Sequence, residues 1–150
     1  MTNLTTYVLM VSEVFPKGMG MDGVNTYFPN KIRDGVKIHT IRTNYPFWKK
    51  RIDAVAAGKA VLSIRRWTGK PYRSSQAEIA RFNHLSGIGI ESVRLAAQGM
   101  PIVNDAIPVS PAIMAHNDGL TLEEFSAWFK DYDHTQEMAI IHFTSFRYSE

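Results

Sequence analysis

The sequence has no cysteine, little excess charge and no long apolar run. The absence of cysteine among its 150 residues excludes a disulfide framework and a thiolate metal site. A net charge of +3 is compatible with an anionic partner but does not require one. No apolar stretch approaches the roughly 18 residues of a membrane span, and the N-terminus lacks the basic start and cleavage site of a signal peptide. We therefore expect a cytoplasmic protein without a membrane segment.

Motifs of several common enzyme classes are also missing. The sequence contains no P-loop, GxSxG or GxGxxG, so NTPase, classical hydrolase and dinucleotide-binding functions have no support from motifs. None of its five histidines lies at a metal-ligand spacing such as HExxH. We therefore expect neither a metal site nor a cofactor.

The residues that are present predict a compact α+β domain. Apolar residues make up 45% of the chain, which is enough for one domain with a substantial core. Periodicity and turn signals predict strands over residues 6–12, 36–43, 60–67, 76–85, 88–95 and 138–148, and helices over 25–34, 46–57 and 121–131. About six strands and two or three helices in mixed order are typical of an α+β fold or a small β-barrel with helices packed at its ends.

The most informative segment lies just after Gly35. It places Lys37, His39, Thr40 and Arg42 within six residues. In a regular strand Lys37 and Thr40 point to opposite faces, so they meet only if the backbone bends near the glycine. The alternative is an edge strand with a polar face and two buried isoleucines.

A second candidate region is the turn between two expected strands, residues 65–73. Cations there suit phosphate groups, and flat rings offer stacking surfaces for unpaired bases. The candidate ligand contacts are Arg66, Trp67, Lys70, Tyr72 and Arg73. The alternative is a solvated hairpin whose two rings close the edge of the core.

A third candidate is Asp118, in the segment His-Asn-Asp-Gly-Leu-Thr at 116–121. Such a segment is ordinary turn and cap chemistry before a helix, and Thr121 and Glu124 have the spacing of a capping box. The functional alternative is that the Asp118 carboxylate lies at the helix entrance, next to a ligand.

The segment G-V-K-I-H-T-I-R at 35–42 resembles the G-x-K-x-x-T-x-R signature of ASCH domains, which belong to the PUA-like superfamily. The segments W-x-G-K-P-Y at 67–72 and D-G-L at 118–120 follow in the order of a phage- and prophage-type subgroup. The resemblance covers roughly residues 28–148. It implies a small, partly closed β-barrel with a cleft between the barrel and its helices.

The resemblance also implies an RNA or nucleoside-type ligand, with Arg42 and His39 among its contacts. One branch of the family is an amidohydrolase that removes the acetyl group from N4-acetylcytidine with a lysine, a threonine and a glutamate. Those positions fall on Lys37, Thr40 and Asp118, so this chain has Asp in place of Glu.

If the chain is an enzyme, Thr40 attacks the amide carbonyl and Lys37 is the base, provided that its pKa is lowered by burial or by Arg42. Asp118 then protonates the leaving amine or orients the water. Three alternatives stay open at this point: binding of RNA or a nucleoside, hydrolysis of an acylated nucleoside, and a protein-interaction module.

Overall fold

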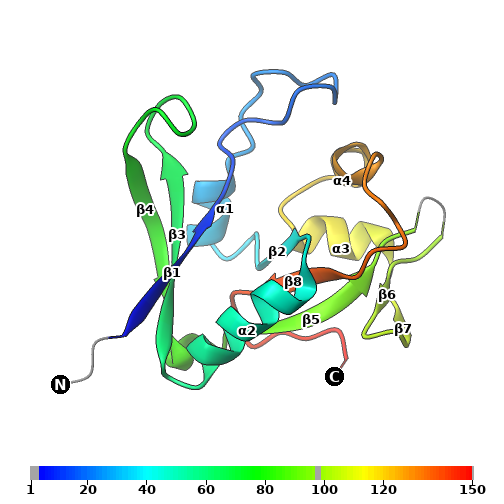
Figure 1. Ribbon diagram of the computed structural model, residues 1–150. Coiled ribbons are helices and arrows are strands. Elements are labelled where there is room, and N and C mark those ends of the chain that lie inside the picture. Colours follow the sequence, from blue (N-terminus) through cyan, green and yellow to red (C-terminus); the bar gives the residue numbers. More distant parts are fainter. Residues whose placement is uncertain (1–3, 97–98, 150) are drawn as a thin grey trace.

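The structure is a computed structural model that describes residues 4–96 and 99–149. Within them the chain forms an α+β fold whose strands pair in two sheets (Figure 1). The three-stranded sheet has the order β1-β3-β4, and β1 is parallel to β3 whereas β4 is antiparallel to it. Its strands are β1 (Thr5–Met10), β3 (Ala60–Trp67) and β4 (Gln76–Phe82).

The second sheet is antiparallel throughout and has the order β2-β8-β5-β6-β7. Its strands are β2 (His39–Arg42), β8 (Met138–His142), β5 (Gly89–Arg94), β6 (Ile102–Val103) and β7 (Ile107–Pro108). The expected α+β class is therefore confirmed. The described strands do not close into one barrel, because hydrogen bonding stops at the edges of two separate sheets.

Four α-helices lie among the described residues: α1 (Phe28–Arg33), α2 (Tyr45–Ala56), α3 (Pro111–Asn117) and α4 (Leu122–Phe129). Figure 1 shows α3 and α4 on the side of the five-stranded sheet and α1 beside the three-stranded one. The helix predicted over 46–57 is confirmed as α2. Its N-cap Asn44 accepts a hydrogen bond from the Phe47 N–H, and Ile52 and Val55 are fully buried.

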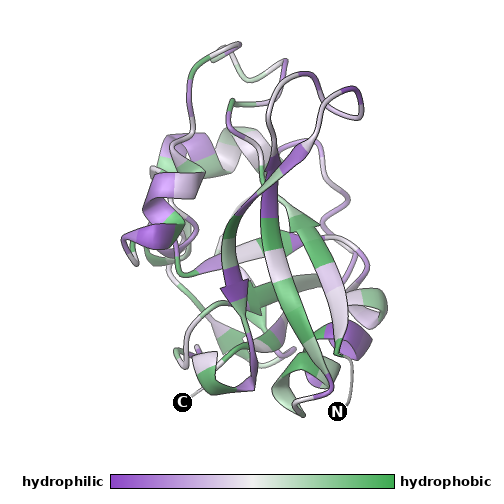
Figure 2. Ribbon diagram, turned by 90° about the vertical axis from the view of Figure 1, so that its left-hand side faces the viewer, coloured by the Kyte–Doolittle hydropathy of each residue, from purple (hydrophilic) through white to green (hydrophobic). Residues whose placement is uncertain are grey.

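The core lies between the sheets and the helices that cover them. All five residues of β8 are buried, since this strand is flanked by β2 and β5 in the middle of its sheet. In the three-stranded sheet the first five residues of β3 are buried and the last three are partly exposed. Figure 2 shows the corresponding change from apolar strand centres to a more hydrophilic hairpin tip. None of the helices described spans enough apolar residues to cross a membrane.

Several predicted boundaries were wrong because backbone hydrogen bonds go elsewhere. The strand expected over 36–43 begins only at His39, since the N–H groups of Lys37 and Ile38 donate to the carbonyls of Lys31 and Asn117. The closing strand expected to reach residue 148 ends at His142. The helix expected over 25–34 begins at Phe28, after a left-handed Tyr27.

Other predictions missed short elements. The strand expected over 76–85 ends at Phe82 and is followed by a 3-10 turn, His84–Ser86. The segment 99–111, which lies outside the expected elements, contains the two-residue strands β6 and β7, and the helix α3 was not predicted. By contrast, the capping box of Thr121 and Glu124 is confirmed at the start of α4. The sequence was sufficient to predict this helix start, because the capping box involves only four consecutive residues.

Candidate functional site: a polar and aromatic cavity

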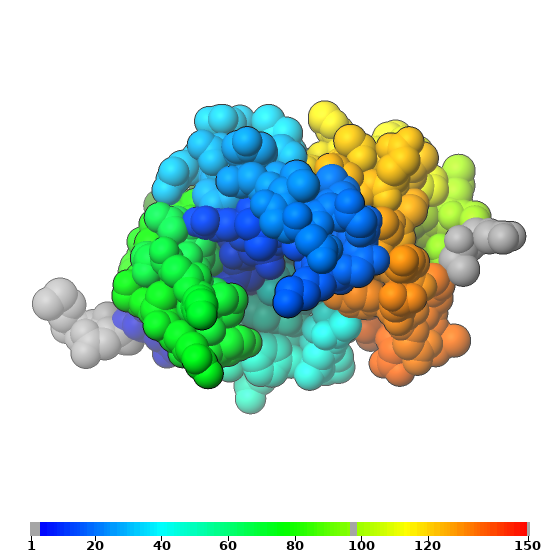
Figure 3. All heavy atoms as spheres, turned by 90° about the horizontal axis from the view of Figure 1, so that it is seen from above, coloured from blue at the N-terminus to red at the C-terminus, as the bar shows by residue number. Residues whose placement is uncertain are grey.

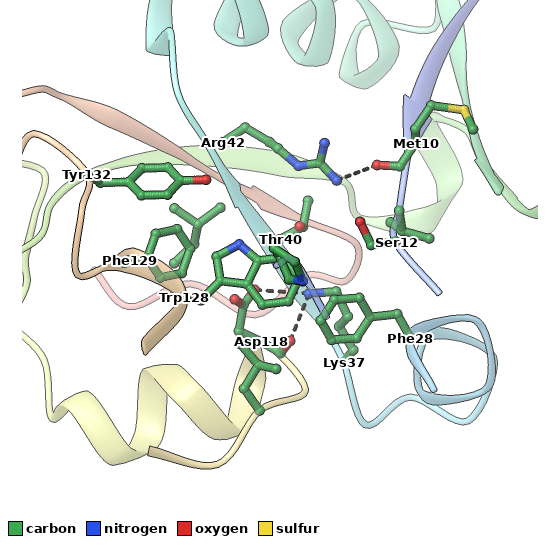
Figure 4. Close-up of a pocket in the computed structure, with 14 residues that line it drawn as sticks. Met10, Ser12, Phe28, Lys37, Thr40, Arg42, Asp118, Trp128, Phe129 and Tyr132 are labelled. Atoms are coloured by element: carbon green, nitrogen blue, oxygen red, sulfur yellow. Dashed lines mark hydrogen bonds and ion pairs between the residues drawn. The ribbon is translucent and has the colours of Figure 1, made fainter. Parts of the chain in front are cut away.

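A cavity of about 290 Å³ lies where the end of β1, the strand β2 and the segment from α3 to α4 meet. Figure 4 shows that its side chains come from distant parts of the chain. The lining includes both polar and aromatic side chains. The polar group comprises Lys37, Thr40, Arg42 and Asp118, and the aromatic group comprises Phe28, Trp128, Phe129 and Tyr132.

Lys37 is the most deeply placed cation of this cavity, with only 2% of its surface exposed. Its ammonium group donates to the Asp118 backbone carbonyl at 2.8 Å and to Asp118 Oδ1 at 3.1 Å. The same Nζ lies 4.2 Å from the centre of the Phe28 ring. Burial lowers the pKa of Lys37 below its ordinary value, while Asp118 opposes the shift and Arg42 adds to it. The structure thus holds an amine that is easier to deprotonate than a surface lysine.

Thr40 lines the same cavity as Lys37 and is 5% exposed. Strand alternation would have separated the two side chains. It does not apply here, because Lys37 precedes the first residue of β2 and its backbone follows a turn bonded to Lys31. The bend that the sequence required near Gly35 is present: that glycine has a φ of 72°.

Asp118 ends α3 and is held by a chain of buried polar groups. His39 Nδ1 lies 3.2 Å from Asp118 Oδ1, and His39 Nε2 lies 2.7 Å from the Tyr148 hydroxyl. That hydroxyl also accepts a hydrogen bond of 3.0 Å from the Asn117 side-chain amide. Both ring nitrogens of His39 are therefore engaged, one by the Asp118 carboxylate and one by the Tyr148 hydroxyl.

His39 lies behind the Asp118 carboxylate, away from the cavity. It is fully buried and does not line the cavity. Burial raises the pKa of Tyr148 to about 12, with a further contribution from Asp118 that the Asn117 hydrogen bond opposes. The phenol therefore stays protonated at neutral pH and remains a hydrogen-bond partner of His39.

Arg42, the last residue of β2, lies at the edge of the cavity. Its Nη2 donates to the Met10 carbonyl at 2.5 Å and so connects the two sheets. Burial lowers the pKa of Arg42, and Asp118 and Tyr132 oppose this shift. Because an arginine keeps its charge in proteins, the guanidinium remains a cation beside the cavity.

A second buried polar cluster, centred on Glu91 and His142, was not predicted. His142 Nε2 lies 2.8 Å from Glu91 Oε1, and the backbone N–H groups of Tyr148 and Ser149 donate to the same carboxylate at 2.8 and 3.2 Å. Burial by itself raises the pKa of Glu91, but these hydrogen bonds outweigh it and leave the pKa below its ordinary value. Burial lowers the pKa of His142 to about 3. The cluster thus holds the chain near Tyr148 in place.

The five predicted ligand contacts of the hairpin lie in different surroundings. Trp67 and Tyr72 line a second cavity, of about 410 Å³. Arg66 forms an ion pair of 2.8 Å with Glu13. Lys70 and Arg73 are exposed on the hairpin and line neither cavity.

The sequence held only partial signals for the residues that were missed. The sequence places Trp128 and Phe129 in the helix expected over 121–131, but no signal marks them as cavity walls. Glu91 and His142 are 51 positions apart, and no local pattern connects them. Among residues 4–96 and 99–149, no three His, Asp or Glu side chains are grouped so that they would hold a metal ion.

Comparison of the chain with protein-family models, curated proteins and solved structures found no significant match.

Proposed function

We propose that the 290 Å³ cavity binds a nucleoside-type ligand, either a nucleotide of RNA or a modified nucleoside, and that the chain is an ASCH-type domain of the PUA-like superfamily. The observation that carries this proposal is that one cavity is lined both by aromatic rings, among them Trp128 and Phe28, and by polar groups, among them Thr40 and Asp118. A flat base can stack on the rings while its edge exchanges hydrogen bonds with the polar groups. In this proposal the two described sheets correspond to an open form of the PUA-like barrel.

The size and charge of the cavity support a small anionic or polar ligand. Ligand cavities commonly measure about 300–1,000 Å³, so a volume of about 290 Å³ suits a single base or nucleoside. Arg42 at its edge offers a fork of N–H donors suited to a phosphate or a sugar hydroxyl. Both properties agree with an unpaired nucleotide inserted into the cavity.

A second candidate function is hydrolysis of an acyl amide on the base, and it is favoured because Lys37, Thr40 and Asp118 line one cavity. Thr40 Oγ1 bonds to the acyl carbon while its proton passes to a neutral Lys37. The carbon–nitrogen bond then breaks as the leaving amine takes a proton from the Lys37 ammonium or from Asp118. Water hydrolyses the remaining acyl ester and releases the acid and Thr40.

Calorimetric titration with cytidine and N4-acetylcytidine, together with chromatography of the products, tests both functions. We expect both nucleosides to bind, and Trp128→Leu to weaken both because it removes a stacking surface. If the second function holds, N4-acetylcytidine is converted to cytidine, and Thr40→Val stops this conversion while it weakens binding only by the loss of one hydrogen bond. The matched control is Thr43→Val, at an exposed threonine outside the cavity. Absence of binding by either nucleoside at millimolar concentration would refute the proposal.

A further inference from the structure

The second cavity, of about 410 Å³, adjoins the first. It lies between residues 10–14 and the tip of the β3–β4 hairpin. The two cavities share four lining residues: Met10, Val11, Ser12 and Arg42. Seen from above, the surface is hollowed between the green hairpin, the blue segment after β1 and the cyan segment around residue 45 (Figure 3). A ligand in the first cavity can therefore continue past Arg42 into the second.

Tyr72 is presented to solvent at the edge of this second cavity. Its side chain is 89% exposed, and its φ of 62° lies in the left-handed region, which is unfavourable for a residue with a large side chain. Its ring lies 5.2 Å from the Trp67 ring, centre to centre. Backbone strain of this kind is often found at ligand-binding positions, and here the strained residue also lines a cavity.

Hydrogen bonds within the hairpin tip fix the backbone that carries these rings. Ser74 Oγ donates to the Lys70 carbonyl at 2.8 Å and accepts from the Gly69 N–H at 3.0 Å. The Thr68 N–H donates to the Ser75 carbonyl at 2.9 Å. A preorganised surface of this kind loses little conformational freedom when a ligand stacks on it.

The charges around the second cavity suit a phosphodiester. Glu13 is an acid in its lining, but Arg66 neutralises it at 2.8 Å. Lys70 and Arg73 are exposed on the same hairpin tip, and Arg42 lies on the wall common to both cavities. Cations beside exposed rings are the combination with which proteins bind single-stranded nucleic acid.

We infer that the second cavity is a subsite for the neighbouring nucleotide, so that the ligand is a single strand of at least two nucleotides. One base occupies the first cavity, the connecting phosphate passes Arg42, and the next base stacks on Tyr72 and Trp67. This inference rests on the proposed function, since it extends the same ligand beyond the first cavity.

The test compares the dissociation constants of cytidine and the dinucleotide CpC, measured by calorimetry on the full chain. Stacking of one base contributes about 1–3 kcal/mol, so CpC should bind roughly five- to 150-fold more tightly than cytidine. Tyr72→Asn removes the ring, and asparagine tolerates the left-handed backbone. We expect this variant to lose the advantage of CpC and to keep the affinity for cytidine.

The chain offers a closely matched control in Tyr27→Asn. Tyr27 is also exposed, at 58%, and has a similar φ of 58°, but it lines neither cavity. This variant should bind both ligands as the unaltered protein does. If CpC binds no more tightly than cytidine, or if Tyr72→Asn weakens both ligands equally, the second subsite is refuted while the first stands. If neither ligand binds, the proposed function itself is refuted.

Discussion

The ammonium group of Lys37 donates two hydrogen bonds to Asp118, one to its backbone carbonyl and one to its carboxylate, across 81 positions of the sequence. Both side chains are almost completely buried. This contact joins the turn before β2 to the end of α3 and places an amine and a carboxylate in the wall of one cavity. It is therefore both a structural connection and the centre of the candidate site.

Replacing Lys37 with methionine should destabilise the protein strongly. The substitution keeps an apolar chain of similar length but leaves the Asp118 carboxylate buried without its cation, which costs about 3 kcal/mol or more. Urea denaturation measures the change in the free energy of unfolding. The control is Lys49→Met, which removes an exposed ion pair with Asp53 and should cost less than about 1 kcal/mol. Equal effects of the two substitutions would contradict the role assigned to the buried pair.

Alanine at Gly119 should disturb Lys37, whereas alanine at Gly35 should only strain the backbone. The two glycines have similar φ values, 79° and 72°, at which an alanine costs about 1 kcal/mol. A Cβ on Gly119 would lie 3.0 Å from the Lys37 Cβ, but one on Gly35 would meet nothing within 4 Å. We expect Gly119→Ala to cost at least about 1 kcal/mol more, because crowding adds to the strain.

The same pair of variants distinguishes an effect on stability from an effect on ligand binding. Calorimetric titration with cytidine should show weaker binding for Gly119→Ala and unchanged binding for Gly35→Ala. Identical losses of stability and affinity in the two variants would mean that the close packing of Gly119 on Lys37 has no consequence.

Stability should fall in mild acid because of His142. Its pKa is lowered in the folded protein from 6.5 to about 3, first by burial and then by the nearby His39. The unfolded chain therefore takes up a proton at higher pH than the folded protein does. Above pH 6.5 His142 is neutral in both states and does not affect the free energy of unfolding. As the pH falls from 6.5 toward 3, protonation of the unfolded chain lowers that free energy, by up to about 1.4 kcal/mol per pH unit.

Urea denaturation at a series of pH values measures this dependence. His142→Gln retains an N–H that can reach Glu91 but does not titrate, so its stability should fall less steeply below pH 6.5. His84→Gln, at an exposed histidine, provides the comparison and should retain the full slope. A slope unchanged by His142→Gln would show that other groups cause the acid sensitivity.

Removing the Tyr148 hydroxyl should lower the free energy of unfolding, because it breaks the hydrogen bonds behind Asp118. Tyr148→Phe leaves the buried His39 Nε2 and the Asn117 amide without their common partner, at a cost of about 1–3 kcal/mol. Thermal and urea unfolding measure this cost. For comparison, Tyr7→Phe alters a ring that packs against the Arg51 guanidinium, and its hydroxyl has no partner within residues 4–96 and 99–149, so stability should change little.

The sequence by itself determined the elements whose signals are local. The strand over residues 60–67 and the helix α2 follow from apolar periodicity, and the capping box at Thr121 places the start of α4. Such signals act over a few residues, so they persist whatever the rest of the chain does. The sequence also singled out Lys37, Thr40 and Asp118, since their chemistry is visible without any structure.

Only the tertiary structure decided how these residues meet. Lys37 and Thr40 share a cavity because the N–H groups of Lys37 and Ile38 bond to Lys31 and Asn117 instead of to a neighbouring strand. The partner Asn117 belongs to α3, a seven-residue helix whose pattern is too short to predict. The pairing of Glu91 with His142 likewise spans 51 positions. Contacts of this kind depend on the packing of segments far apart in sequence, and local periodicity carries no information about them.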